Sequence, residues 1–185
     1  MSVEPSVNGA NVILSRRALE TLVGADVVAR ALASLPHDLV EPYTSVTTVG
    51  WVPVRSVDAV TTAVAEAAPG WTAERLSADS ARIGVEALMK GLWRVILRFT
   101  SDEALVARTP LLYSKTYNVG KLESAIPRPG HAEVTHSGWR GITDLQIVGL
   151  AAGIETVLRC AGRRDATVAG KRTPTGAFFT GTWSP

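Results

Sequence analysis

The chain has 185 residues, with nineteen basic and seventeen acidic side chains and a net charge of +2. This length is typical of one domain that buries roughly 70% of its unfolded surface. Basic residues never run beyond two in succession. The sequence therefore argues against an electrostatic nucleic-acid surface, because such a surface needs clustered cations.

Cysteine usage and hydropathy exclude further classes of protein. Cys160 is the only cysteine, so neither an intrachain disulfide nor a cysteine-based zinc cluster can form. No apolar run reaches the roughly 18 residues of a membrane span. The N-terminus MSVEPSVNGANVILS lacks the basic region of a signal peptide. We therefore expect a cytoplasmic protein with no membrane span.

The first two thirds of the chain predict helices separated by Pro- and Gly-containing loops. We expect residues 1–14 to form a flexible tail and residues 15–185 to form a single α+β domain. Residues 37–53 are predicted to be a loop. Helices are predicted over Arg16–Leu35 with a break at Gly24, over Ser56–Ala68, from Thr72, over Val85–Phe99, and from the cap Ser101, with Pro110 kinking the last helix or starting a new turn.

The last third of the chain predicts two strand pairs on either side of an apolar helix. The strands are Gly120–Ile126, His131–Ser137, Asp165–Gly170 and Gly176–Trp183, and the helix is Asp144–Ala161. Helices followed by the order β-β-α-β-β predict an α+β fold. In this fold the N-terminal helices pack on a C-terminal four-stranded antiparallel sheet.

Three segments together resemble a known family. They are Trp51-Val52-Pro53-Val54, the stretch Leu92–Asn118 with the continuation to Gly120, and the closing Phe179-Thr180-Gly181-Thr182-Trp183. Their order resembles a paralogous family of myxobacterial proteins of unknown function. That family is similar to vinyl-reductase-like domains and to transport-particle subunits of the Bet3 type.

The resemblance implies the arrangement of the Bet3-type and vinyl-reductase-like domains, with helices on one face of a four-stranded antiparallel sheet. It also implies pairing as dimers and an apolar pocket for a lipid chain or an aromatic effector. It supplies no catalytic residues to carry over. The metal-binding cysteines of some sensor relatives have no counterpart in this chain.

His131, Glu133 and His136 are the nearest approach to a metal or acid–base constellation. On a strand, side chains alternate between the two faces, so residues 131 and 133 share one face and residue 136 points to the other. Two ligands are too few for a closed zinc site. The sequence therefore predicts no metal and no cofactor, and it contains no nucleophile elbow, Walker loop or dinucleotide-binding glycine motif.

Aromatic side chains are the best candidates for a pocket wall. Trp93 with Leu97, and Tyr113 with Tyr117, are each spaced to lie on one helix face. With Trp139, these residues are the predicted pocket lining, whereas ordinary core filling is the alternative interpretation.

The sequence as a whole favours a non-enzymatic sensor or interaction domain with an apolar pocket or a dimer surface between helices and sheet. Its expected partners are a second copy of the chain and a small apolar or lipid-like ligand. The homodimer is suggested by the low net charge, the positive mean hydropathy and the Gly149/Gly153 helix. Two alternatives stay open: a small enzyme using His131, Glu133 and His136, and a purely structural scaffolding subunit.

Overall fold

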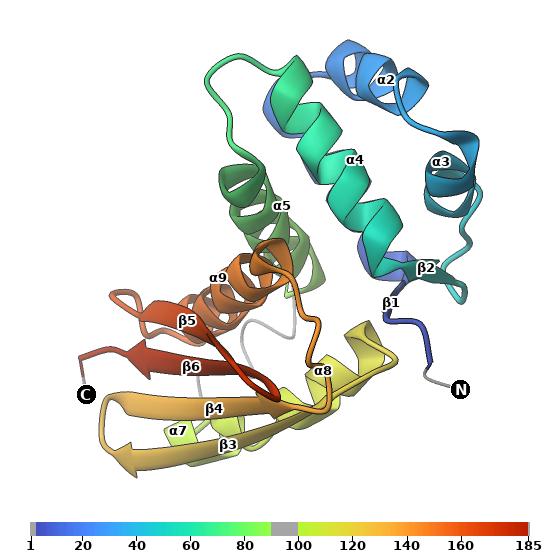
Figure 1. The fold of residues 1–185 in the computed structure, drawn as a ribbon. Helices are drawn as coiled ribbons and strands as arrows, with labels where there is room; N and C mark the ends of the chain where they lie inside the picture. Colours follow the sequence, from blue (N-terminus) through green and yellow to red (C-terminus); the bar gives the residue numbers. More distant parts are fainter. Residues whose placement is uncertain (1–2, 90–99, 185) are drawn as a thin grey trace.

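The computed structural model describes residues 3–89 and 100–184, and it places a group of helices against a four-stranded antiparallel sheet (Figure 1). This arrangement confirms the α+β class and the β-β-α-β-β order after Val119. The helices are α1 Gly9–Val23, α2 Ala25–Ala33, α3 His37–Thr44, α4 Val54–Ala67, α5 Ala73–Leu88, α7 Asp102–Val106, α8 Thr109–Thr116 and α9 Asp144–Cys160. The strands are β1 Ser6–Asn8, β2 Trp51–Pro53, β3 Lys121–Arg128, β4 His131–Ser137, β5 Thr167–Thr173 and β6 Gly176–Thr182.

The sheet has the strand order β3-β4-β6-β5, and each neighbouring pair is antiparallel. Ala132, Val134 and His136 of β4 are buried on the face toward the helices. Phe179 of β6 pairs with Val134 of β4 and is also buried. Alternation with period two thus gives the sheet one inner face, over which α9 lies (Figure 1).

The N-terminal segment differs from the flexible tail expected for residues 1–14. Strand β1 pairs with β2, and Val7 and Val12 are buried. Helix α1 begins at Gly9 rather than near Arg16, because the Asn8 side chain accepts a hydrogen bond from the Ala10 N–H at 3.0 Å. Asn is a preferred helix cap. The polar residue Asn8 therefore caps helix α1, and its segment is folded.

Residues 37–53, predicted to be a loop, contain α3 and β2. The Pro and Thr content of this stretch favours a loop, because Pro in a helix removes a backbone hydrogen bond. Here Pro42 lies within a helix of only eight residues. That helix packs against α4 and buries Tyr43, so tertiary burial outweighs local propensity.

Several predicted helix boundaries are confirmed. Gly24 separates α1 from α2 with a φ of 93°. The hydroxyls of Thr72 and Ser101 accept hydrogen bonds from Arg75 N–H and Ala104 N–H and cap α5 and α7. Pro110 lies in the first turn of the separate helix α8. The predicted helix Val85–Phe99 lies outside the described residues from position 90 onward.

Gly149 and Gly153 allow close packing between α9 and α5. A Cβ on Gly149 would lie 2.9 Å from Oγ of Ser77, and a Cβ on Gly153 would lie 3.7 Å from a Val85 methyl. The Ser77 hydroxyl donates to the Leu145 carbonyl at 2.8 Å. The small-residue motif therefore serves a helix–helix contact within the chain, and the homodimer stays a prediction.

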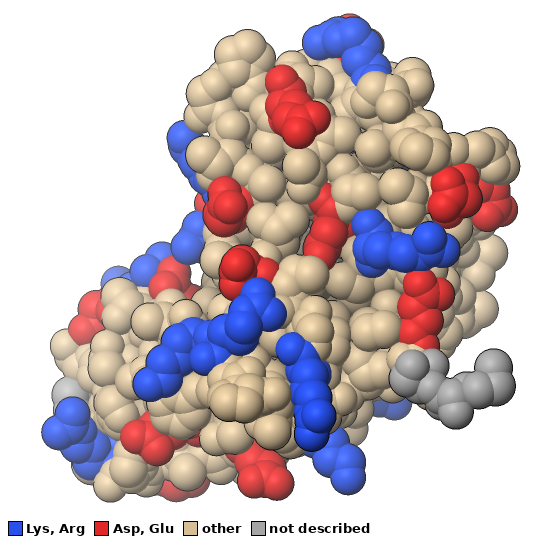
Figure 2. Space-filling model, in the orientation of Figure 1, with Lys and Arg blue, Asp and Glu red and all other residues tan. Residues whose placement is uncertain are grey.

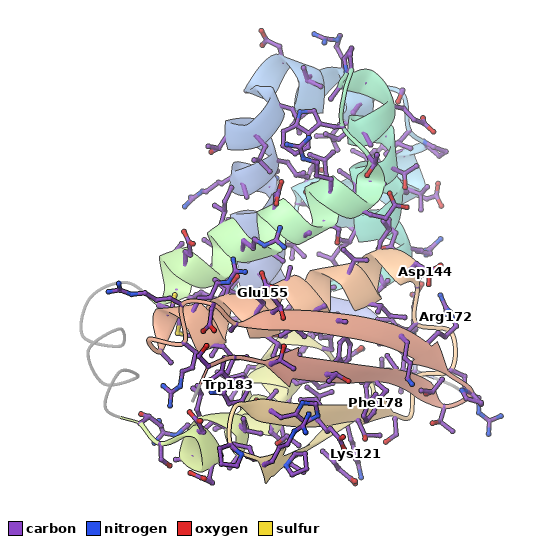
Figure 3. The ribbon with its side chains drawn as sticks, turned by 90° about the vertical axis from the view of Figure 1, so that its left-hand side faces the viewer. Lys121, Asp144, Glu155, Arg172, Phe178 and Trp183 are labelled. Atoms are coloured by element: carbon purple, nitrogen blue, oxygen red, sulfur yellow. The ribbon has the colours of Figure 1, made fainter. Side chains whose placement is uncertain are left out.

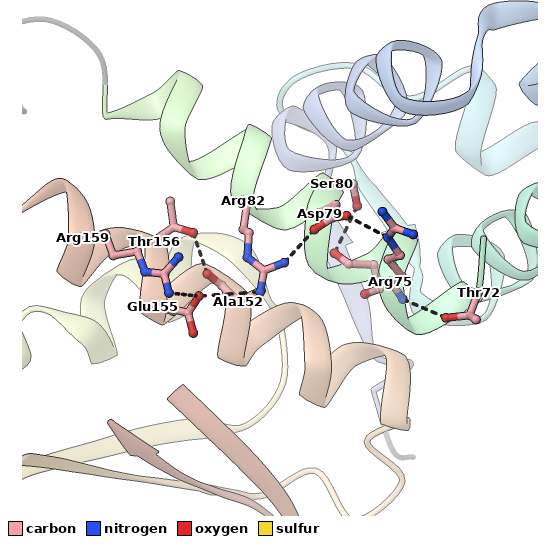
Figure 4. Close-up of polar contacts among 10 residues, drawn as sticks. Thr72, Arg75, Asp79, Ser80, Arg82, Ala152, Glu155, Thr156 and Arg159 are labelled. Atoms are coloured by element: carbon pink, nitrogen blue, oxygen red, sulfur yellow. Dashed lines mark hydrogen bonds and ion pairs between the residues drawn. The ribbon is translucent and has the colours of Figure 1, made fainter. Parts of the chain in front are cut away.

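Ion pairs add to the contact between α5 and α9 (Figure 4). Arg82 of α5 lies 2.6 Å from Asp79 and 3.6 Å from Glu155 of α9. Arg159 lies 3.1 Å from the same Glu155 carboxylate, whose other oxygen accepts from Val168 N–H of β5. At the other end of α9, Asp144 lies 2.6 Å from Arg172 of β5 (Figure 3). These contacts fix α9 between α5 and the sheet.

The outer surface seen in Figure 2 carries basic and acidic side chains interspersed over both the helical part and the sheet part. Within the described ranges, no helix is long and apolar enough to cross a bilayer.

Candidate ligand cavity

A cavity of about 460 Å³ lies between the helices and the inner face of the sheet. Helices α1, α4, α5 and α9 form one side, the sheet forms another, and α7, α8 and β1 contribute further residues. Its volume falls within the range of about 300–1,000 Å³ that is typical of small-molecule sites.

Most of the cavity wall is apolar. It includes Val85 of α5, Met89 directly after that helix, Ile154 and Val157 of α9, and Phe179 of β6. Hydroxyls on the wall are largely satisfied by the protein itself: Thr61 donates to the Val57 carbonyl and Thr116 to the Leu112 carbonyl. An occupant of this space would therefore contact chiefly hydrocarbon.

Four rings form an aromatic cluster beside the cavity: Tyr113, Tyr117, His136 and Trp139. Tyr113 and Tyr117 stack with centroids 5.1 Å apart, and Tyr117 lies 5.5 Å from Trp139. His136 is 5.2 Å from Tyr113 and 5.9 Å from Trp139. Both tyrosines line the cavity, whereas His136 and Trp139 lie behind them.

His136 is fully buried and held in one tautomer. The Tyr113 hydroxyl donates its only proton to the Val119 carbonyl at 2.7 Å. The contact of 2.7 Å between this hydroxyl and His136 Nε2 therefore requires Nε2 to carry a hydrogen. His136 Nδ1 then has no partner among the described residues, and burial lowers the pKa of the imidazole. His136 is thus a neutral structural side chain.

Asp58 of α4 is the acidic group among the described residues of the cavity wall. The Thr143 hydroxyl donates to one carboxylate oxygen at 2.7 Å, and the Gln146 amide donates to the other at 2.6 Å. The Tyr117 hydroxyl donates to Gln146 Oε1 at 2.7 Å, which orients the amide nitrogen toward Asp58. Three side chains thus hold this carboxylate in place.

The charge of Asp58 has no cationic counterpart within residues 3–89 and 100–184: no Lys, Arg or His there forms an ion pair with it. Burial raises the pKa of the Asp58 carboxyl, and the hydrogen bonds from Thr143 and Gln146 oppose that shift only in part. Lys115 is the basic residue on the described wall, and its side chain is exposed on α8.

The sheet separates the residues of the proposed acid–base set. His131 Nε2 lies 3.6 Å from the Glu133 carboxylate on the outer face. His136 is buried on the inner face, as the alternation predicts. The three side chains therefore cannot act together on one substrate.

The structure brings together Tyr113, Tyr117 and Trp139 from the predicted pocket lining, with only the two tyrosines on the cavity wall. Trp93 and Leu97 lie outside the described residues. Sequence reasoning missed Asp58 and Gln146. One signal was present, since Thr143-Asp144-Leu145-Gln146 has the pattern of a helix-capping box. Here the Gln146 side chain reaches Asp58 instead of returning to the cap.

Comparison with solved structures reveals the same fold elsewhere. A mutant of Cs H-NOX with 4-cyano-L-phenylalanine aligns with a TM-score of 0.70, at 13% identity, over 96% of this chain and 97% of that chain. The Fe(II) unliganded H-NOX protein from K. algicida aligns with a TM-score of 0.67, at 8% identity, over 96% and 97%. An H-NOX structure used to probe heme distortion gives 0.69, at 14% identity, over 96% and 95%.

No protein-family model and no curated protein matches the sequence. The resemblance to the myxobacterial family, to vinyl-reductase-like domains and to Bet3-type subunits is wrong, because the structural neighbours are H-NOX domains. Of the three segments that carried that resemblance, the first contains β2 and the last belongs to β6, where they serve strand pairing. The stretch Leu92–Asn118 lies outside the described residues up to position 99, and its described part contains α7 and α8. Across nearly its whole length, the chain has the fold of the H-NOX domains.

Proposed function

We propose that this chain is a non-enzymatic sensor domain that binds a small apolar molecule in the cavity between α5, α9 and the sheet. The observation that carries the proposal is the cavity of about 460 Å³ with its largely hydrocarbon wall. The apolar area of such a wall drives binding, and a few polar groups orient the ligand. The structural neighbours support a ligand-binding role, since they include structures that address heme distortion and protein-induced porphyrin distortion.

Heme is the ligand that these neighbours suggest, and its binding requires a side chain that can coordinate the iron. Heme iron in proteins is held by His, Cys thiolate, Met or Tyr. The histidines of the chain are His37, His131 and His136, and the one cysteine is Cys160. None of these four residues lies on the cavity wall, and residues 90–99 contain neither residue type.

The remaining donors fit heme iron poorly. The Tyr113 hydroxyl donates to the Val119 carbonyl, and the Tyr117 hydroxyl donates to Gln146 Oε1. Burial raises the pKa of both phenols, which disfavours the phenolate that binds iron. Met89 alone offers a neutral thioether. The cavity residues of this chain therefore do not fit heme, and we propose an iron-free apolar ligand instead.

A fluorescence titration with N-phenyl-1-naphthylamine, a neutral apolar probe, tests the proposal. We expect saturable binding of one probe per chain to the wild type. Gly153→Leu should weaken binding at least tenfold, because its side chain enters the cavity and its Cβ meets only an ordinary contact with Val85. Gly141→Leu is the matched control, since Gly141 is exposed, has open space around it and lies off the cavity wall.

Equal loss of binding in both variants, or no saturable binding to the wild type, would count against a ligand cavity and favour the scaffolding alternative. A parallel titration with hemin tests the donor argument. We expect no stoichiometric complex with a sharp Soret band. A tight one-to-one heme complex that is lost in Met89→Leu would show that the Met89 thioether is able to hold heme iron.

A further inference from the structure

The Asp58 carboxylate is a feature of the described cavity wall that an apolar ligand alone does not explain. Asp58 lines the cavity, and most of the other lining side chains, such as Val57 and Leu150, are apolar. Burying a charge without a counter-ion costs free energy unless hydrogen bonds compensate for the lost water. A half-buried carboxylate that is held by hydrogen bonds on a cavity wall is therefore a candidate contact for a ligand.

The bonds that Asp58 already makes leave it able to accept more. An ionised carboxylate has about four acceptor sites on its two oxygens. Thr143 donates to one oxygen and Gln146 to the other, so each oxygen keeps a free acceptor site. Both bonds join α4 to the first turn of α9, where a negative charge is stabilised by the helix dipole. They fix the carboxylate without neutralising it.

We propose that the ligand of this cavity is an apolar molecule with one hydrogen-bond donor, a hydroxyl or a protonated amine, that binds the Asp58 carboxylate. This inference rests on the proposed function and adds the chemistry of the ligand's polar end. The apolar body lies along α5 and α9, and the donor group meets the carboxylate beside Tyr117 and Gln146.

A ligand with a negatively charged end would instead pair with Lys115. Its ammonium is the basic group on the described wall, and a carboxylate ligand would pair with it. Lys115, however, is exposed near the end of α8, where water solvates the ammonium and an ion pair contributes little. Asp58 is held by the buried Gln146 and the half-buried Thr143, and it has more to gain from a ligand contact.

Four ligands on one scaffold separate these chemistries: 1-methylnaphthalene, 1-naphthalenemethanol, 1-naphthalenemethylamine and 1-naphthoic acid. Each is measured by displacement of N-phenyl-1-naphthylamine from the wild type, Asp58→Asn and Lys115→Gln. For the wild type we expect the alcohol and the amine to bind at least tenfold more tightly than the methyl compound, and the acid to bind most weakly.

Asp58→Asn should lower amine affinity at least tenfold and leave the methyl compound unchanged. It keeps the shape of the side chain and an acceptor for Gln146, and its thermal unfolding reports whether the variant is folded. Lys115→Gln should leave the order of the four ligands unchanged. A stronger effect on the amine than on the alcohol identifies an ammonium ligand, and equal effects identify a hydroxyl.

The inference fails if the methyl compound binds the wild type as tightly as the alcohol and the amine, although the proposed function would then stand. It also fails if the acid binds best and loses affinity in Lys115→Gln. Absence of binding by all four compounds and by the probe would instead overturn the proposed function itself.

Discussion

Tyr113 Oη lies 2.7 Å from His136 Nε2, and this contact joins α8 to β4 at the inner face of the sheet. The pair is buried beside the cavity, and the tyrosine is one of its walls. A structural histidine thus supports a cavity-lining ring without itself meeting the cavity. The burial of His136 makes the free energy of unfolding depend on pH.

The first prediction concerns this histidine. Burial lowers the His136 pKa below the ordinary value of 6.5, so below that pH the unfolded chain takes up a proton that the folded chain does not. The free energy of unfolding should therefore fall as pH drops from about 7 to about 5. The free energy of unfolding, measured with urea across this range, should depend less steeply on pH in His136→Gln than in the wild type. The exposed His37→Gln should keep the wild-type slope, and identical slopes in all three proteins would contradict the prediction.

The second prediction concerns Gly120, whose φ of 79° would strain any other residue. A Cβ there would lie 2.4 Å from His136 Nε2 and 2.8 Å from the Tyr113 hydroxyl. Gly120→Ala should therefore destabilise the fold by more than the roughly 1–3 kcal/mol of backbone strain alone. Gly70→Ala is the control, with a φ of 84° and open space around it. Equal losses of unfolding free energy would show that the close contact adds nothing.

The third prediction compares two glycines of α9. Replacing a helical Gly with Ala gains about 1 kcal/mol from helix propensity where space allows. Gly153→Ala should realise this gain, because its Cβ would meet only a 3.7 Å contact with Val85. Gly149→Ala should be less stable than Gly153→Ala, because its Cβ would press on the Ser77 hydroxyl at 2.9 Å. Chemical unfolding of both variants measures the difference, and the reverse order would mean that α5 and α9 pack in another register.

The fourth prediction treats Asp58 in the ligand-free protein. Burial raises the Asp58 pKa, so its ionised form is less favourable in the folded than in the unfolded state. Stability from this group is therefore present at low pH and declines as pH rises through the raised pKa. Asp58→Asn should raise the melting temperature at pH 7, as expected where a binding residue is kept at a cost in stability. A lower melting temperature would show that Thr143 and Gln146 need the negative charge.

Much of the fold could be predicted from the sequence, because local signals determine it. The Pro129-Gly130 and Pro174-Thr175 turns lie between alternating strands, and Gly24, Thr72 and Ser101 mark helix boundaries at their own positions. Strand β1 and helix α3 were missed because their signals are not local. Strand β1 pairs with residues more than forty positions away, and α3 depends on the burial of Tyr43.

The candidate site was predictable only in part for the same reason. Tyr113 and Tyr117 are four residues apart, so their stacking follows from helical spacing. Asp58 meets Thr143 and Gln146 across 85 and 88 residues of chain, and no pattern in one sequence indicates such a contact. The polar end of the cavity is therefore a property of the tertiary fold.

The measurement that tests the account most directly is a crystal structure of the protein with N-phenyl-1-naphthylamine. We expect one probe molecule between α5, α9 and the sheet, in contact with Gly153 and Val157 and with its amine hydrogen directed toward Asp58. Protein side chains filling that space, with the probe bound only on the outer surface, would contradict the existence of a ligand cavity and with it the proposed function.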